Sequence, residues 1–365
     1  MSKGWKGRVS VCAATAVLVA GVLAGCGSSS SSGGSSSTQS AAAATTGAGG
    51  SQVVATPTYN GPEAALPGTV PAPSGHKRFT IGYLQIYGGV GTLVATADQV
   101  RATVEKLGGT FVEKDANLNA QDQVSLFDQF ISQHVDAIIV FPIDPAALAP
   151  ELKAAAAAKI PVIAENATTE GGQALPSGYE TTINEALDTS AYSLAKQAAE
   201  RSPHGSFVVM GTSLPIPTVQ YDQARLAYWG KRFGLHELGQ VDNDEDNPSG
   251  YSAAATTLAA RYPHAQIVFA YDDPYALAVA QTLRAAGDTG TLVSSSIGGE
   301  QDAFDAIKAG RLNAVYAMPW RQIGTESVYA TYDVLTHQHL PLAKVVFPRG
   351  TLVTSANVSS VQSVP

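Results

Sequence analysis

The sequence predicts an α/β protein of two doubly wound lobes with a ligand cleft between them. From Phe79 onward, short apolar runs alternate with amphipathic segments. The clearest unit spans residues 135–166, where two apolar runs enclose an Ala-rich segment. Near-continuous apolar strands are typical of parallel sheets covered by helices on both faces. A second series of alternating strands and helices begins after residue 183, so two sheets are expected.

The first series begins with an apolar strand and a helix that Gly108-Gly109 ends. Its next helix places Val124, Phe127 and Ile131 on one face, as burial requires. An Ala-rich helix then joins the third strand to the fourth. In chain order we expect strands over residues 79–86, 110–114, 135–141, 160–164 and 179–183 and helices over residues 91–107 and 121–133.

The second series has the same pattern. Pro274 suits the first turn of a helix, with Asp273 as the expected N-cap and Asp272 turned toward the cleft. We expect strands over residues 206–211, 235–241, 266–271, 292–296 and 314–318 and helices over residues 187–201, 219–232, 250–262, 274–286, 301–309 and 323–335.

The N-terminal stretch is secretory in form. Lys3, Lys6 and Arg8 precede an apolar region of residues 9–22, which is too short to span a bilayer as a mature helix. Leu-Ala-Gly-Cys follows and resembles the lipobox of bacterial lipoproteins, in which the cysteine, here Cys26, is lipidated. The alternative is an ordinary signal peptide with a chance cysteine. Lipidation would anchor the protein to the outer face of the cell membrane without a spanning helix.

Domain boundaries follow from composition. Residues 27–51 are mostly Ser, Gly, Ala and Thr, and a Pro-rich polar stretch extends to Arg78, so this region is expected to be a disordered tether. The expected segments are a signal peptide (1–25), the lipidated cysteine and tether (26–78), a first lobe (79–182, completed by about 319–338) and a second lobe (183–318, completed by about 339–356).

Charge and motifs exclude several functions. The formal net charge is −8 without a basic patch, which argues against nucleic-acid binding. No GxSxG elbow, P-loop or HExxH motif occurs, so the protein is not expected to be an enzyme, and no cofactor or metal is expected. The acidic run of residues 242–246 lacks the glycine and glutamate of a calcium loop and is interpreted as a solvated loop.

A family resemblance covers roughly residues 79–353. Its motifs are residues 136–142 with 160–163, residues 269–278, and the segment AIKAGRLNA at 306–314. In this order and spacing they resemble the ribose-binding-like branch of the type I periplasmic binding proteins. The resemblance implies two lobes joined by three hinge crossings, capture of a small sugar-like ligand by closure, and delivery to the permease of an ABC importer.

The same resemblance suggests ligand-binding positions. Arg225 matches an arginine that donates hydrogen bonds to the ligand, and its five-donor fork suits hydroxyls or a carboxylate. Asp272 matches a ligand-binding Asn or Asp, and its alternative role is a helix cap. Gly298 stands where relatives have a ligand-binding Asp, and Asn166 where they have an Asp followed by an Arg; here Ala167 follows. Asn166 could equally be a turn residue.

Other departures point to a rewritten pocket. Thr92, Leu93 and Met318 replace ligand-binding residues of relatives, while Glu165, Glu300 and several tyrosines are nearby. Tyr87 and Trp320 are candidates to stack on a ligand, although Trp320 could also pack in the hinge. Three rival functions differ in class: a receptor subunit for a sensor kinase or chemoreceptor, an extracytoplasmic hydrolase, and a repressor-type regulator.

Overall fold

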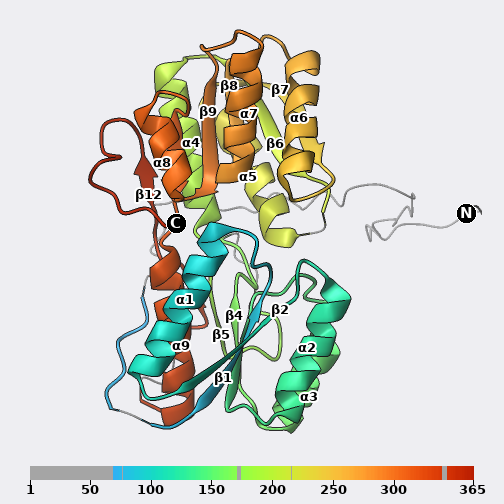
Figure 1. Cartoon of the computed structure of the whole chain (residues 1–365), viewed down its shortest axis with the longest axis vertical. Helices are drawn as coiled ribbons and strands as arrows, with labels where there is room; N and C mark the ends of the chain where they lie inside the picture. Colours follow the sequence, from blue (N-terminus) through green and yellow to red (C-terminus); the bar gives the residue numbers. More distant parts are fainter. Residues whose placement is uncertain (1–68, 76, 171–173, 215, 339–342) are drawn as a thin grey trace, which may run out of the picture. The chain divides into compact units, whose positions relative to one another are not determined.

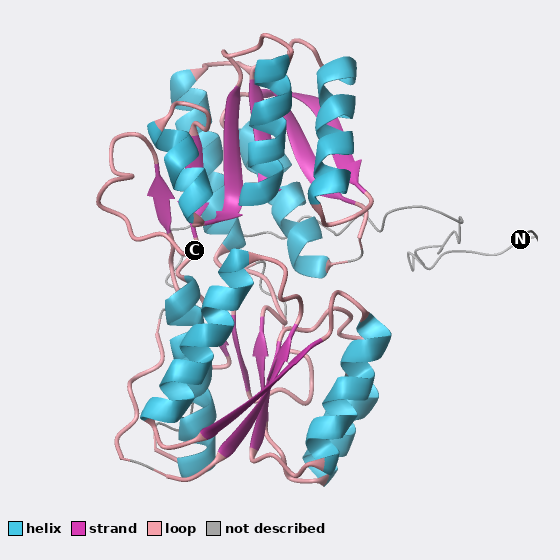
Figure 2. Ribbon diagram, viewed as in Figure 1, coloured by secondary structure: helices cyan, strands magenta, loops and turns pink. Residues whose placement is uncertain are grey.

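The computed structural model describes residues 69–365 except 76, 171–173, 215 and 339–342 (Figure 1). Cys26, the expected signal peptide and most of the expected tether lie outside these residues. The described chain forms two α/β lobes, each with a six-stranded sheet and helices on both sheet faces (Figure 2). The predicted fold class is therefore confirmed. No helix within the described part of the chain has the length and apolar character needed to cross a membrane.

In the first lobe the strand order is β11-β5-β4-β3-β1-β2, and all of these neighbours pair in parallel. Helices α1 and α9 pack together on one face of this sheet, and α2 and α3 pack together on the other (Figure 1). The strands are β1 (Thr80–Gln85), β2 (Thr110–Asp115), β3 (Ala137–Val140), β4 (Val162–Glu165), β5 (Thr181–Ile183) and β11 (Val345–Val346); the helices are α1 (Gly91–Lys106), α2 (Ala120–Ser132), α3 (Ala149–Ala157) and α9 (Trp320–Thr336).

In the second lobe the order is β12-β10-β9-β8-β6-β7, and only β12 runs antiparallel to its described neighbour. Helices α4 and α5 pack together, as do α6 and α7. The strands are β6 (Ser206–Thr212), β7 (His236–Asn243), β8 (Ile267–Asp272), β9 (Leu292–Gly298), β10 (Ala314–Ala317) and β12 (Thr351–Val353); the helices are α4 (Leu187–Arg201), α5 (Pro217–Arg232), α6 (Pro248–Arg261), α7 (Asp273–Ala285) and α8 (Gln301–Lys308).

The unit β3-α3-β4 shows why the apolar runs predict the fold. Every residue of β3 is buried, and alternate residues enter different cores: Ile139 packs with α1 and α9, whereas Ile138 and Val140 pack with α2 and α3. Since side chains of a strand alternate between the two sheet faces, burial on both faces requires an unbroken apolar run. Ile138 pairs with Val162, so β3 and β4 are parallel as predicted.

The chain passes between the two sheets three times, through residues 184–186, 318–319 and 347–350. Helix α9 packs on α1 and β4, in agreement with its expected place in the first lobe. One expected boundary needs correction, because Val345-Val346 pairs with β5 of the first sheet, whereas the sequence placed residues 339–356 in the second lobe. A two-residue strand carries no periodicity by which a sequence could assign it to a sheet.

Candidate functional site

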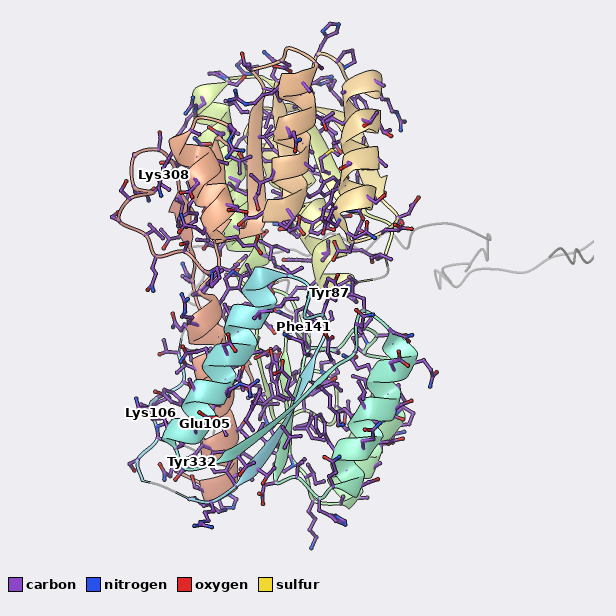
Figure 3. All side chains as sticks on the ribbon, viewed as in Figure 1. Tyr87, Glu105, Lys106, Phe141, Lys308 and Tyr332 are labelled. Carbon is purple, nitrogen blue, oxygen red and sulfur yellow. The ribbon has the colours of Figure 1, made fainter. Side chains whose placement is uncertain are left out.

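A cavity lies between the two lobes at the carboxyl ends of their strands. The volume open to water within it is about 80 Å³. Tyr87 and Phe141 lie at the edge of the first lobe that faces the second (Figure 3). The lining includes Tyr87, Leu93, Phe141 and Trp320 from the first lobe, Asp246, Tyr271 and Asp272 from the second lobe, and Glu185 from the first crossing.

The first lobe presents a mostly apolar wall. Tyr87 follows β1 and Phe141 follows β3, so the strand-end rule places both at the cavity. Trp320 is 3 % exposed at the start of α9, and its Nε1 donates a 2.9 Å hydrogen bond to the carbonyl of Gly298. Because that indole N–H is used within the hinge, the ring offers the cavity an aromatic surface. Trp320 therefore lines the cavity and also packs in the hinge.

The second lobe presents carboxylates at the end of β8. Asp272 lines the cavity and is the N-cap of α7, where its Oδ1 accepts a 2.9 Å hydrogen bond from the backbone N–H of Tyr275. This corrects the expected division of roles, in which Asp273 was the cap. Asp273 is buried and instead accepts hydrogen bonds from the backbone N–H groups of Gly299 and Glu300, at 2.7 and 2.8 Å.

Asp246 is a functional candidate that sequence reasoning missed. The acidic run of residues 242–246 was expected to be a solvated loop, yet Asp246 lines the cavity. Its Oδ1 accepts hydrogen bonds from the hydroxyls of Tyr271 and Tyr251, the latter at 2.6 Å. Tyr251 also lies 3.1 Å from Asp272 Oδ2. Burial, and next the charge of Asp246, raise the pKa of Asp272 well above its usual value.

Glu185 is the second missed candidate, and Asn166 holds it in place. Asn166 adopts a left-handed backbone with φ 57°, which asparagine tolerates well, so its turn role is real. Its Nδ2 donates to Glu185 Oε1 at 2.7 Å, and its Oδ1 accepts from the backbone N–H of Glu185 at 2.6 Å. Asn166 is not among the residues that line the cavity, whereas Glu185 is. Burial raises the pKa of Glu185 to about 8.

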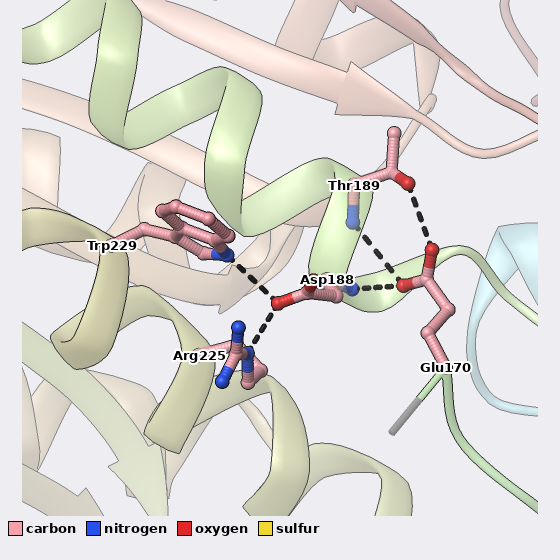
Figure 4. Close-up of polar contacts among 5 residues, drawn as sticks. All are labelled: Glu170, Asp188, Thr189, Arg225 and Trp229. Atoms are coloured by element: carbon pink, nitrogen blue, oxygen red, sulfur yellow. Dashed lines mark hydrogen bonds and ion pairs between the residues drawn. The ribbon is translucent and has the colours of Figure 1, made fainter. Parts of the chain in front are cut away.

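Arg225 lies away from the cavity lining. Its side chain is fully buried in α5, where Nε donates to Asp188 of α4 (Figure 4). Asp188 also accepts a 2.8 Å hydrogen bond from Trp229 Nε1. Behind it, Glu170 accepts hydrogen bonds from the Thr189 hydroxyl at 2.8 Å and from two backbone N–H groups at the start of α4. The arginine thus joins α4 and α5 through an ion pair.

Gly298 lies beside the cavity rather than in its lining. An added Cβ would meet Asp273 Oδ1 at 2.3 Å and Val315 Cγ1 at 2.4 Å, so the close approach of these groups requires glycine. The adjacent Ile297 lines the cavity instead. Of the six predicted ligand-binding residues, the structure brings together Tyr87, Asp272 and Trp320.

Glu300 links the lobes outside the cavity lining. Burial raises the pKa of its carboxyl to about 7, and the backbone N–H groups of Thr92 and Gly91 at the start of α1 oppose that rise. The N-cap of α1, Val90, provides no side-chain acceptor for these groups. An acidic side chain of the second lobe therefore lies beside the N-terminus of a helix of the first. Over the described residues, no group of three or more His, Cys, Asp and Glu side chains is arranged to hold a metal ion.

Comparisons with known proteins identify similar binding proteins by sequence and by structure. A family model described as "Periplasmic binding protein domain" matches residues 86–339. The ribose import binding protein RbsB of Bacillus subtilis is 24% identical over 73% of this chain and 85% of the relative. The fructose import binding protein FruE of Bifidobacterium longum is 26% identical over 72% and 80%, respectively. The arabinose-transporter binding protein of Shewanella sp. ANA-3 superposes with a TM-score of 0.70 at 19% identity, covering 77% of this chain and 93% of its own.

Proposed function

The chain belongs to the periplasmic binding protein domain family, and on that premise we propose that it captures a small sugar-like solute for an ABC importer. The observation that carries this proposal is the cavity itself, because both lobes and the first crossing contribute to its lining. A ligand that contacts both lobes favours the conformation in which they are closest, by its difference in affinity for the two states. The permease would then recognise the closed form.

The relatives support the ligand class. Those named above are binding proteins for ribose, fructose and arabinose, and a solved structure from Mycobacterium smegmatis with TM-score 0.70 holds glycerol. All of these are polyhydroxylated molecules. We infer that hydroxyl groups of the ligand bond to the polar groups of the second lobe, while Tyr87 and Trp320 cover its apolar face. Arg225, Asn166 and Gly298 act indirectly in this proposal, through the elements that they hold.

The N-terminal stretch supports a site of action at the outer face of the cell membrane. We propose that Cys26 is lipidated and that the segment after it is a tether. Metabolic labelling with a palmitate analogue tests this: label should appear on the wild type and on Cys12→Ser, and be lost on Cys26→Ser. Label retained on Cys26→Ser would exclude the anchor.

Ligand capture is tested on the purified protein by thermal shift and small-angle scattering. Ribose, fructose, arabinose, xylitol, glycerol and myo-inositol form the panel. A ligand at one hundred times its Kd should stabilise the native state by about 2.7 kcal/mol, and the radius of gyration should fall with it. Trp320→Leu should weaken both effects. A ligand that binds without compaction would contradict the closure mechanism.

A further inference from the structure

The cavity is lined by acidic side chains and, among the described residues, by no basic one. Three carboxylate side chains line it, those of Glu185, Asp246 and Asp272. Among the described residues that form the lining, none is Lys, Arg or His. Arg225, the cation that the family resemblance assigns to ligand binding, is buried against Asp188 instead. The described part of the cavity therefore has acidic side chains without a basic partner.

Asp246 and Asp272 have fewer hydrogen-bond donors than the number of close contacts to them, because one hydroxyl contacts both. Tyr251 Oη lies 2.6 Å from Asp246 Oδ1 and 3.1 Å from Asp272 Oδ2. A phenol has a single proton, so Tyr251 donates to only one of the two at a time. Tyr271 also donates to Asp246, the aspartate that makes the shorter of the two Tyr251 contacts. The two carboxyl groups thus share two hydroxyl protons and one backbone N–H, and an added positive charge would favour their ionised forms.

Glu185, from the first crossing, provides an independent observation. Its side chain is 4 % exposed and lines the cavity, yet only Oε1 accepts a hydrogen bond, from Asn166. Burial raises the pKa of this carboxyl to about 8, so it is largely protonated at pH 7 before a ligand binds, and a positive charge beside its unused oxygen would shift it to the carboxylate. An ammonium group has three N–H donors and no acceptor, which suits a wall of acceptors better than a neutral hydroxyl does.

The rest of the lining suits a cation as well. Tyr87, Phe141, Tyr271 and Trp320 place aromatic rings around the same cavity as the carboxylates. Aromatic faces attract cations, more strongly where water is displaced. The remaining lining residues are apolar, such as Leu93 and Ile297, apart from the hydroxyl-bearing Thr92 and Thr218.

We propose that this cavity selects a small sugar-like or polyol ligand that carries a protonated amine, held by Glu185 and the Asp246–Asp272 pair. The inference rests on the proposed function and names the ligand class of that same site. Closure would place the amine among the carboxylates and the carbon frame against the aromatic rings of the first lobe.

Matched ligand pairs test the inference by titration calorimetry on the purified protein at pH 7. The pairs are glucosamine and glucose, galactosamine and galactose, and glucamine and sorbitol. In at least one pair the amine should bind about ten-fold or more tightly than its neutral parent, the equivalent of one charge-assisted hydrogen bond. Glu185→Gln and Asp272→Asn should each reduce that preference, whereas Asp128→Asn, the same charge change at an exposed position of α2, should not.

Each outcome decides between the two proposals. Neutral parents that bind as tightly as the amines would overturn the amine inference and leave sugar capture intact. Melting curves first establish that both variants are folded. If neither substitution then changes the amine preference, the amine is not held by Glu185 and the Asp246–Asp272 pair. Absence of binding by every member would remove the amine inference together with the sugar-like ligand class.

Discussion

Asp188 and the Asp246–Asp272 pair, all in the second lobe, differ in whether a cation lies beside them. Asp188 is buried with a cation, Arg225, and with the indole N–H of Trp229 (Figure 4). Asp246 and Asp272 have only hydroxyl and backbone donors and line the cavity. In this lobe the carboxylate paired with a cation joins two helices, whereas these two carboxylates without a cation line the cavity. The residue types alone do not separate these roles; the partner does.

The largest expected effect comes from breaking the balanced pair. Arg225→Met leaves Asp188 buried without its cation, and such a loss typically costs about 3–5 kcal/mol. The guanidinium also lies 4.1 Å from the ring centre of Tyr228, so its packing is lost as well. Urea unfolding should show the loss, and the double variant Arg225→Met with Asp188→Asn should recover a large part of it. Wild-type stability with abolished ligand binding would instead place Arg225 at the ligand.

A second test uses Glu165, which is buried in the first lobe and contacts only hydroxyl donors. Its oxygens accept hydrogen bonds from Tyr83 at 3.0 Å and Ser327 at 2.9 Å, and burial raises its pKa from 4.5 to about 7. The folded state then binds this proton more tightly than the unfolded state does. Its contribution to stability is therefore full below pH 4.5, is lost as the pH rises to about 7, and stays constant above that.

Glu165→Gln removes this titration. At pH 8 the variant should be more stable than the wild type by up to about 3 kcal/mol, and the difference should vanish near pH 4. Urea unfolding at a series of pH values measures it, with Glu105→Gln at an exposed position of α1 as the control. An equal stability change at pH 4 and pH 8 would show that the carboxyl does not titrate in this window.

A third test removes the hydroxyl that lies between Asp246 and Asp272, the two aspartates of the cavity lining. Tyr251→Phe removes the hydroxyl between Asp246 and Asp272 and leaves the ring, which stacks on Tyr275, in place. Hydrogen bonds to charged groups contribute about 1.5–3 kcal/mol, so a loss of about 2 kcal/mol is expected at pH 7. Tyr262→Phe, at the C-cap of the same helix, is the matched control and should change little. Unaltered stability in both variants would mean that Tyr251 is not needed to support the wall.

Features that depend on a local pattern could be predicted from the sequence, whereas pairings between distant side chains could not. The unit β3-α3-β4 was predicted because burial on both sheet faces leaves an unbroken apolar run, a local property. The sequence placed Tyr87, Asp272 and Trp320 at the cavity because strand ends converge on a cleft, and their contact with a ligand stays a prediction. The direction of Arg225 depends on Asp188 in another helix, and no local pattern encodes that pairing.

The missed candidates fall into two kinds. Phe141 and Glu185 lie at or just after strand ends, so a stricter use of the same rule would have included them. Asp246 sits in an acidic run that looks solvated, and only the hydroxyls of Tyr251 and Tyr271, which belong to separate elements, bring it to the cavity wall. Contacts between distant segments therefore mark the limit of prediction from the sequence.

The smallest expected effect concerns Glu300, whose carboxyl group lies beside the N-terminus of α1. The backbone N–H groups of Thr92 and Gly91 at the start of α1 lower the pKa of its carboxyl. Val90, the N-cap of α1, provides no side-chain acceptor for them. Glu300→Gln removes the charge at this helix N-terminus, an interaction of about 0.3–1 kcal/mol. If the contact belongs to the closed form, the apparent ligand affinity should fall about two- to five-fold, because the competent state is less populated. Calorimetry with any ligand from the panel measures this fall, and Asp302→Asn, a charge change at an exposed position in the first turn of α8, should leave the affinity unchanged. A fall of the same size in both variants would assign the effect to general charge rather than to the contact between the lobes.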